Sequence, residues 1–480
     1  MEPGFLPATK LAALVRRGTV GCLELLDHFI ARVERLDPRL NAVVVRDFER
    51  ARDTARAMDR RRNKTAPGKL HGVPMTVKES FDVAGLPTTW GAPECRDNIA
   101  SANALAIERL EGAGAVVFGK TNVPLMLDEW QSFNEIYGAT SNPWDLERTP
   151  GGSSGGAAAA LAAGLTGLEL GTDIGGSVRV PAHMCGVYAH KPTWGLCPPR
   201  GHSLKRTIAP VDIAVIGPLA RSADDLALAM EAIAGPDPSD TRLEFVLPPP
   251  RTSKLRAMRV AVWACDDATA TDPEITAKLL ELAQALEHAG AKVDRLARPA
   301  FEAKAAYELY VRLLAAAVGS RLSADAIDAA RERSAARAQG DPSTAALMDR
   351  NYDLPYRTWA TLNEERHVLR RTWQAFFEDW DVLLCPAFGT PALPQDTVTS
   401  TADRRVCVDG REIAYDDLLF WPGITGGFHV PATVAPLGFT AGGLPLGVQI
   451  VGPLFGDRAT IAFARLLESV WLAFTPPPLP

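Results

Sequence analysis

One glycine-rich segment, residues 149–193, constrains the fold of this chain more than any other part of the sequence. It holds two glycine-flanked serine clusters, GGSSGG at 151–156 and DIGGS at 173–177, separated by the small, apolar run 157–168. That run is shorter than the ~18 uninterrupted apolar residues of a membrane span, so it predicts a buried helix. Glycines before a serine also let backbone N–H groups converge on an oxyanion. The segment therefore predicts either two turns around a core helix or a catalytic serine site.

A serine needs a base before it can act as a nucleophile, and the sequence offers two kinds. Lys78 ends the apolar stretch 73–77, which predicts a strand. A lysine at the end of a buried strand loses hydration, which lowers its pKa and frees the amine to accept a proton. His183 and His190 follow the second serine cluster, although an isolated histidine is more often structural. A Ser–Lys and a Ser–His arrangement both stay open at this point.

The distribution of apolar residues predicts one large α/β unit preceded by a helical region. Residues 1–65 show helical periodicity, and from residue 66 onward short β-rich stretches alternate with helices, as is typical of an α/β or mixed sheet. Proline and polar residues mark 235–254 as a linker or surface excursion, and 301–379 is predicted to be a helical insertion. Because predicted strands occur on both sides of the linker, we expect 66–480 to form a single domain.

Composition and motif spacing exclude several other classes of protein. Lys and Arg total 51 against 57 Asp and Glu, a net charge of −6, whereas a nucleic-acid-binding protein usually has a basic face. The seven cysteines form no Cys-x-x-Cys pair and no His-Glu-x-x-His occurs, so we expect no disulfide framework, no metal site and no cofactor.

Residues 114–121 satisfy G-x-x-x-x-G-K-[ST], but they read as a strand and not as a phosphate-binding loop. With no signal peptide or membrane span predicted, we expect a soluble cytoplasmic protein.

Several separated motifs together resemble one family of enzymes. They are HGVP followed by Lys78, GKTN at 119–122, NPW at 142–144, GGSSGG, GTDIGGSVR, and GLP at 443–445. In sequence and in spacing these motifs resemble the amidase signature hydrolases. The resemblance is dense from about residue 70 to 220, thinner in the helical middle, and returns after about 380. It implies an α/β fold, with a large mixed β-sheet core flanked by helices on both faces.

The resemblance also implies a serine–serine–lysine triad that works through an acyl-enzyme. Ser177 would be the nucleophile, and Ser153 would be the bridging serine, following a cis peptide bond after Gly152. Lys78 would be the general base behind Ser153. All three positions hold the residue that the family pattern requires.

The loop around Ser177 is implied to stabilise the oxyanion formed during the reaction. Its backbone N–H groups would form the oxyanion hole, at Ile174, Gly175, Gly176 and the nucleophile itself. Asp173 and Arg179 are interpreted as buried charges that hold this loop and take no part in the chemistry.

The expected substrates are small amides, and esters or carbamates as well, with an apolar or aromatic group. The predicted substrate-binding residues are Met126, Leu127, Trp130, Gly152, Ile424 and Phe428. Most of these are apolar, which suits an aryl or aliphatic group. His429 stands two residues before Pro431, where many relatives carry glycine, so the neighbouring pocket wall is expected to be unusual.

A related protein with another role is the glutaminase subunit of the aminoacyl-tRNA amidotransferase. It uses the same triad to supply a partner subunit with ammonia, and it needs charged groups to hold a free amino acid. Residues 359–373 resemble stand-alone amidases instead. We therefore expect a small-molecule amide as the only partner, with no nucleic acid and no membrane, and a homodimer is left open.

Overall fold

A large mixed β-sheet forms the centre of the computed structural model, which describes residues 2–61, 68–204, 208–239 and 245–479. Its strand order is β10-β9-β11-β15-β14-β7-β8-β6. The strands are β6 (Glu169–Asp173), β7 (Tyr188–Lys191), β8 (Val215–Ala220), β9 (Arg259–Val262), β10 (Lys292–Asp294), β11 (Val382–Pro386), β14 (Ala432–Phe439) and β15 (Pro445–Val451). The pairs β10–β9 and β9–β11 are parallel and the other neighbours are antiparallel. The expected mixed sheet is confirmed.

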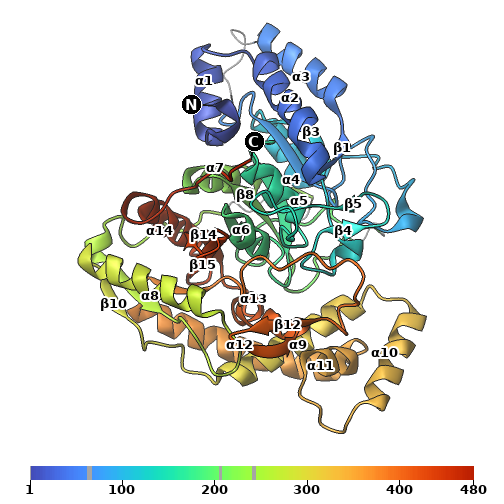
Figure 1. Cartoon of the computed structure of the whole chain (residues 1–480), viewed down its shortest axis with the longest axis vertical. Coiled ribbons are helices and arrows are strands. Elements are labelled where there is room, and N and C mark those ends of the chain that lie inside the picture. The colour runs from blue at the N-terminus through green and yellow to red at the C-terminus, as the bar shows by residue number, and fades with distance from the viewer. Residues whose placement is uncertain (1, 62–67, 205–207, 240–244, 480) are drawn as a thin grey trace.

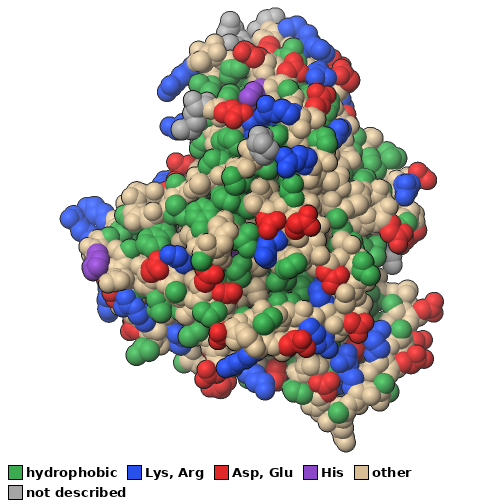
Figure 2. Space-filling model, in the orientation of Figure 1, with side chains coloured by type: hydrophobic (Ala, Val, Ile, Leu, Met, Phe, Trp, Pro, Cys, Tyr) green, Lys and Arg blue, Asp and Glu red, His purple; other side chains and the backbone are tan. Residues whose placement is uncertain are grey.

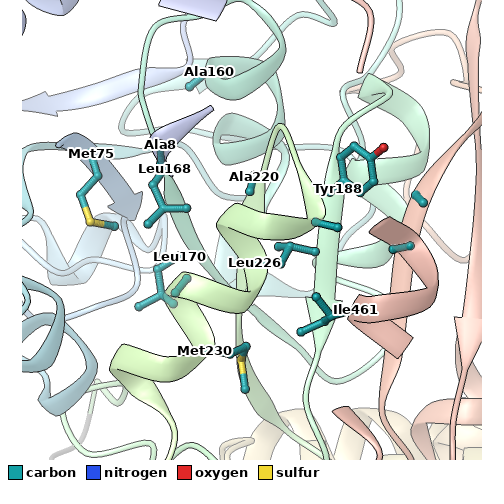
Figure 3. Packing of buried hydrophobic residues seen from close by; sticks show 14 of the residues in the cluster. Ala8, Met75, Ala160, Leu168, Leu170, Tyr188, Ala220, Leu226, Met230 and Ile461 are labelled. Atoms are coloured by element: carbon teal, nitrogen blue, oxygen red, sulfur yellow. The ribbon is translucent and has the colours of Figure 1, made fainter. Parts of the chain in front are cut away.

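Both faces of this sheet are covered by helices, because its central strands are buried along their whole length. In β11, Val382 and Leu384 pack into the same core cluster as residues of three helices on one face of the sheet. Leu383 and Cys385 pack on the other face, with residues of α9 (Ala303–Gly319), α12 (Tyr356–Asp379) and α13 (Phe420–Gly426). The three helices of the first face are α7 (Ala223–Ile233), α8 (Pro273–His288) and α14 (Asp457–Val470). Figure 3 shows Leu226 and Met230 of α7 and Ile461 of α14 among the packed core side chains.

The N-terminal region is not purely helical, which corrects the expectation for residues 1–65. Its helices are α1 (Ala8–Arg17), α2 (Cys22–Leu40) and α3 (Phe48–Arg61), but β1 (Val43–Arg46) lies between the last two. β1 pairs antiparallel with β3 (Val116–Thr121), which in turn pairs parallel with β2 (Pro74–Lys78). The β-branched run Val43–Val45 favours an extended strand over a helix here. Residues 62–65 lie outside the described part of the chain.

The predicted helical stretch 301–379 consists of four helices. They are α9 (Ala303–Gly319), α10 (Ala324–Ala336), α11 (Thr344–Asn351) and α12 (Tyr356–Asp379). Figure 1 shows them at the opposite end of the molecule from α1–α3. The predicted linker 235–254 has neither helix nor strand at 235–239 or 245–254, and residues 240–244 lie outside the described residues.

The small, apolar run after GGSSGG forms the buried helix α5 (Gly155–Ala162), as predicted, and each of its residues is buried. In the described ranges, no helix is both long and apolar enough to cross a membrane. Figure 2 shows acidic and basic side chains interspersed over the visible face. The remaining α-helices and β-strands are α4 (Leu105–Gly112), α6 (Arg179–Cys185), β4 (Phe133–Asn134), β5 (Gly138–Ala139), β12 (Arg405–Val408) and β13 (Arg411–Ala414).

Candidate active site

Three segments that are distant in the sequence meet at Lys78, Ser153 and Ser177. Lys78 ends β2, Ser153 lies in the turn before α5, and Ser177 lies between β6 and α6. The Lys78 Nζ is 2.7 Å from Ser153 Oγ and 3.0 Å from Thr172 Oγ1. Ser153 and Ser177 both line one cavity, and the Ser154 N–H donates to the Ser177 carbonyl over 3.0 Å. The lysine and the two serine clusters are therefore parts of a single site.

The turn before Ser153 requires glycine because the backbone passes very close to a neighbouring segment. The Gly152–Ser153 peptide bond is cis, as the family resemblance implied. A Cβ on Gly152 would lie 2.3 Å from the Glu129 carbonyl oxygen, a distance that no side chain tolerates. Gly152 thus packs against the backbone of residues 129–130 and is not among the side chains that line the cavity.

Burial makes Lys78 suitable as a base near neutral pH. Its side chain is fully buried, and this desolvation lowers the pKa of Lys78 to about 7, although the charge of Asp173 opposes the shift. Lys120 and Lys191 are also buried, and burial lowers their pKa values to about 8 and about 7. Their amines, however, contact the backbone carbonyls of Pro87 and Pro192. Position beside a serine hydroxyl, and not burial alone, distinguishes Lys78.

The two histidines that the sequence left open as bases are engaged elsewhere. His183 lies between Gly447 and Thr390, with its Nδ1 2.9 Å from the Gly447 N and its Nε2 2.9 Å from the Thr390 carbonyl oxygen. His190 contacts Thr433 Oγ1 at 2.9 Å and Asp457 Oδ1 at 3.0 Å. Both rings are fully buried, and both of their nitrogens have a protein partner. The arrangement favours lysine over histidine as the base.

The backbone of the loop before Ser177 offers hydrogen-bond donors, with one correction to the expected set. The Gly176 N–H donates to Asp173 Oδ1 over 2.9 Å and is therefore already used within the loop. The N–H groups of Ile174, Gly175 and Ser177 have no acceptor among the described residues. These three N–H groups remain available to a substrate oxygen.

Asp173 and Arg179 form a buried ion pair beneath this loop. Arg179 Nη2 is 2.8 Å from Asp173 Oδ1, and neither side chain is exposed. Burial alone would raise the pKa of Asp173, but Arg179 lowers it to about 2. Arg179 also donates to the Pro422 carbonyl and to Gln449, which joins the loop to α13 and β15. Both charges have full sets of partners, which supports a structural role for the pair.

Two aromatic side chains fix the carbonyl groups of the same loop. The Tyr310 hydroxyl donates to the Ile174 carbonyl over 3.0 Å, and Trp130 Nε1 donates to the Gly175 carbonyl over 3.0 Å. Because each peptide unit is planar, holding a carbonyl also orients the N–H of the following residue. Tyr310 and Trp130 thus help to determine where the N–H groups of this loop point.

Removal of the Tyr310 hydroxyl is expected to destabilise the protein modestly. Tyr310→Phe leaves the Ile174 carbonyl without its side-chain donor, which should lower the free energy of unfolding by about 1 kcal/mol. The midpoint of urea unfolding, at an unchanged slope, measures this loss. Tyr356→Phe is the matched control because Tyr356 is 78% exposed. Equal midpoints for the two variants would contradict the proposed role of this hydrogen bond.

The cavity has two arms that meet at Ser177. One arm, here called the apolar arm, has a volume of about 1100 Å³ including space open to solvent. Its lining includes Trp90, Met126, Leu127, Asp128, Pro199, Val211, Val215, Ile216, Val318, Arg321 and Leu322. The other, here called the polar arm, has a volume of about 1300 Å³ measured in the same way, and its lining includes Asp128, Glu129, Trp130, Arg333, Arg337, Asp349, Tyr352, Tyr415 and Asp416. A bond at Ser177 would therefore have differently lined space on its two sides.

The structure brings only part of the predicted substrate-binding set to the cavity. Met126 and Leu127 line the apolar arm, and Leu127 and Trp130 line the polar arm. Ile424 and Phe428 do not line either arm; both are fully buried in the hydrophobic core. They face the core because α13 and the turn after it pack against α9 and the sheet. The expectation that they form a pocket wall is corrected.

His429 influences the apolar arm only from behind its wall. It adopts a left-handed backbone conformation with φ of 67°, which explains why glycine suits this position. Its ring stacks on Trp194 at 4.7 Å, and its Nε2 is 3.1 Å from Asp212 Oδ1. Asp212 follows Val211, which lines the apolar arm. Burial lowers the pKa of His429 to about 4, so the ring is neutral at neutral pH.

Sequence reasoning missed several charged residues of the cavity. Arg321 reaches the apolar arm from the turn after α9, and its guanidinium lies 5.3 Å from the Trp90 ring centroid. Asp416 lines the polar arm, and Asp128 lines both arms. Asp128 directly follows the predicted pocket residues 126–127, which was a usable signal, but nothing near Asp416 or Arg321 in the sequence marks them.

Comparison with known proteins agrees on one family. A model of the Amidase family matches residues 24–461. An indoleacetamide hydrolase from Bradyrhizobium diazoefficiens is 32% identical over 96% of this chain and 86% of that protein. A glutamyl-tRNA(Gln) amidotransferase subunit from Roseiflexus castenholzii is 31% identical over 97% of this chain and 96% of that protein. The crystal structure of a bacterial aryl acylamidase of the amidase signature family superposes with a TM-score of 0.82 at 25% identity, over 98% of this chain and 96% of that one.

Proposed function

The chain belongs to the amidase signature family of hydrolases, which act on amide bonds, and from this premise we propose that it cleaves small amides with Ser177 as the nucleophile. The observation that carries the proposal is the 2.7 Å contact between the Lys78 amine and the Ser153 hydroxyl, beside a cavity that both serines line. Lys78 and Ser153 then form a path by which the proton of Ser177 can leave.

In the first half of the reaction the neutral Lys78 amine takes the proton of Ser153, which in turn takes the proton of Ser177. The Ser177 Oγ attacks the carbonyl carbon of the substrate, and the carbonyl π electrons move to its oxygen. The N–H groups of Ile174, Gly175 and Ser177 stabilise that negative charge because they are already oriented towards it. When the tetrahedral intermediate collapses, the C–N bond breaks, Ser153 gives a proton to the leaving nitrogen, and Lys78 returns its proton to Ser153. The amine departs and an acyl-enzyme ester remains on Ser177.

Water completes the reaction by the same path in reverse order. Ser153, backed by Lys78, takes a proton from water, whose oxygen attacks the acyl carbon. The ester bond to Ser177 breaks, the serine recovers its proton, and the carboxylic acid is released. Esters and carbamates present the same electrophilic carbonyl to Ser177, so we include them among the substrates.

The lining of the apolar arm supports an apolar or aromatic group on one side of the scissile bond. Met126, Leu127, Val211, Ile216 and the Trp90 ring offer mostly hydrocarbon surface, and burial of apolar surface contributes about 25 cal/mol per Å². Because a methylene group in such a pocket changes binding by only about 1–3 kcal/mol, a broad substrate range should follow.

A second candidate function is the glutaminase role in an amidotransferase. It has support from the similarity over nearly the whole chain to a subunit of a glutamyl-tRNA(Gln) amidotransferase. That role requires activity on free glutamine, which carries two charged groups beside its α-carbon. The apolar lining of one arm favours the stand-alone amidase instead.

A substrate panel and an active-site label test the proposal together. We expect the purified chain alone to hydrolyse anilides and aliphatic amides of apolar acids better than glutamine, and a fluorophosphonate to label Ser177 but no other serine. Treatment with a chelator should leave turnover unchanged. Glutamine as the best substrate, or turnover only after a partner subunit is added, would instead support the amidotransferase role. Loss of activity on chelation with recovery on adding zinc would contradict the serine mechanism.

A further inference from the structure

We propose that the polar arm binds a positively charged amino group of the substrate, so that preferred amides carry an ammonium group on one side of the scissile bond and an apolar group on the other. This inference rests on the proposed function, because it concerns the same cavity and the same nucleophile. It is argued from which charged side chains of the polar arm form ion pairs and which do not.

Most charged side chains of the polar arm are already neutralised by one another. Arg333 Nη2 lies 2.7 Å from Asp349 Oδ1, and Arg337 contacts both Asp349, at 3.4 Å, and Asp341, at 3.6 Å. Glu129 Oε2 is 2.8 Å from Arg404 Nη1. The positive charges of the arm are therefore engaged, and a negatively charged substrate group would find no free cation among the described residues of this arm.

Two carboxylates remain without such compensation. Asp416, which is half-buried, lines the polar arm, and the exposed Asp128 lines both arms; neither side chain has an ion pair or a hydrogen bond within the described residues. Burial, and next to it the negative charge of Asp128, raises the pKa of Asp416 to about 7, although the charge of Arg404 opposes the shift. Desolvation, and next to it the charge of Glu129, raises the pKa of Asp128 to about 6. Like charges placed together are unfavourable, and a cation between them relieves the repulsion. At neutral pH Asp416 is therefore only partly ionised without a substrate, and an ammonium group beside it would lower this pKa and favour the charged carboxylate.

The other walls of the arm also suit a cation. Trp130, Tyr352 and Tyr415 line it, and aromatic rings attract cations through their negatively charged faces. Ser177 stands at the inner end of the arm with its side chain only 6% exposed. Its hydroxyl has no side-chain partner among the residues described and is open to the substrate. A substrate bound in the polar arm would therefore lie between these two carboxyl groups and the Ser177 hydroxyl.

Charge in the other arm would orient such a substrate. The Arg321 guanidinium lines the apolar arm and pairs with no carboxylate in the described parts of the chain. It repels an ammonium group from the apolar arm, whereas Asp416, which lines only the polar arm, attracts the same group there; Asp128 lines both arms and lies where they meet. An amide with one amino end therefore has one favoured direction in the cavity.

Two matched pairs of substrates test the inference. The first pair compares 6-aminohexanoyl anilide with hexanoyl anilide, which places the ammonium group on the acyl side. The second compares the mono-benzamide of 1,5-diaminopentane with N-pentylbenzamide, which places it on the amine side. We expect kcat/KM to be about tenfold or more higher for the ammonium form in at least one pair. A hydrogen bond between an ammonium group and a carboxylate is strong enough to produce a tenfold difference in kcat/KM.

Removal of the carboxylate charge should remove the preference. In Asp416→Asn, and separately in Asp128→Asn, the ratio of kcat/KM between ammonium and neutral substrate should fall several-fold towards one. Asp409→Asn is the matched control: Asp409 is exposed, lies in the turn between β12 and β13, and has φ of 50°, which asparagine tolerates. This variant should keep the wild-type ratio. Thermal unfolding of all three variants shows whether each is folded.

Equal or lower kcat/KM for the ammonium form in both pairs would overturn the inference, as would an unchanged ratio in both folded carboxylate variants. Neither result affects the proposed function as long as the neutral amides are hydrolysed and a fluorophosphonate labels Ser177. Failure of all four amides together with failure of labelling would contradict the proposed function itself.

Discussion

Replacement of Ser177 by alanine is expected to abolish amide hydrolysis while the protein stays folded. The Ser177 Oγ is the proposed nucleophile, and removal of a serine nucleophile lowers kcat by on the order of 10⁶-fold. The side chain is 6% exposed and faces the cavity, so loss of one oxygen should disturb packing little. Initial rates on an anilide, together with fluorophosphonate labelling followed by peptide mapping, measure the effect.

The matched control for this variant is Ser469→Ala, on the exposed side of α14. It should retain both turnover and labelling. Labelling that persists in Ser177→Ala would point to another nucleophile, and Ser153 is the first candidate because it lines the same cavity.

Replacement of Lys78 by methionine is expected to lower kcat/KM by about 10²–10⁴-fold, the usual contribution of a general base. Methionine resembles lysine in length and lacks a charge, so it fills the buried space without leaving a large cavity. The variant should therefore fold, and the measured loss should report on proton transfer. Near-normal turnover in Lys78→Met would show that another group accepts the proton.

The pH dependence gives a second readout of the same residue. Lys78 acts as a base only when its amine is neutral, and burial lowers its pKa to about 7. For the wild type, kcat/KM should therefore rise as the pH increases through about 7 and then level off. The residual rate of Lys78→Met should lack this step, whereas the exposed control Lys254→Met should keep it. A wild-type profile that falls with rising pH across this range would contradict the assignment.

Local sequence signals were sufficient for much of the fold. The apolar stretch 73–77 predicted a strand where β2 occurs, and the small, apolar run after GGSSGG predicted the buried helix α5. These predictions succeed because periodicity and side-chain size act within one element. β1 was missed because its short β-branched run lies between two strongly amphipathic helices, whose periodicity dominates this part of the sequence. Its partner, β3, lies far along the chain.

The candidate site likewise combines residues that the sequence marked with contacts that only the tertiary structure shows. Sequence motifs marked Lys78, Ser153 and Ser177, because glycine and buried-strand contexts are visible locally. Only the tertiary structure places Lys78 at 2.7 Å from Ser153 and engages His183 and His190 elsewhere. The hydrogen bond from the Gly176 N–H to Asp173 likewise depends on the conformation of the loop, which the amino-acid sequence alone does not show.

The sequence by itself therefore determined the kind of chemistry this protein performs, because that chemistry needs particular residue types in particular backbone settings. The tertiary structure alone decided what surrounds the reacting bond. Ile424 and Phe428 look like pocket residues by type but lie in the core, whereas Arg321 and Asp416 reach the cavity from the turn after α9 and from the segment after β13. Which side chains face a cavity depends on how distant elements pack, and a local pattern does not encode that packing.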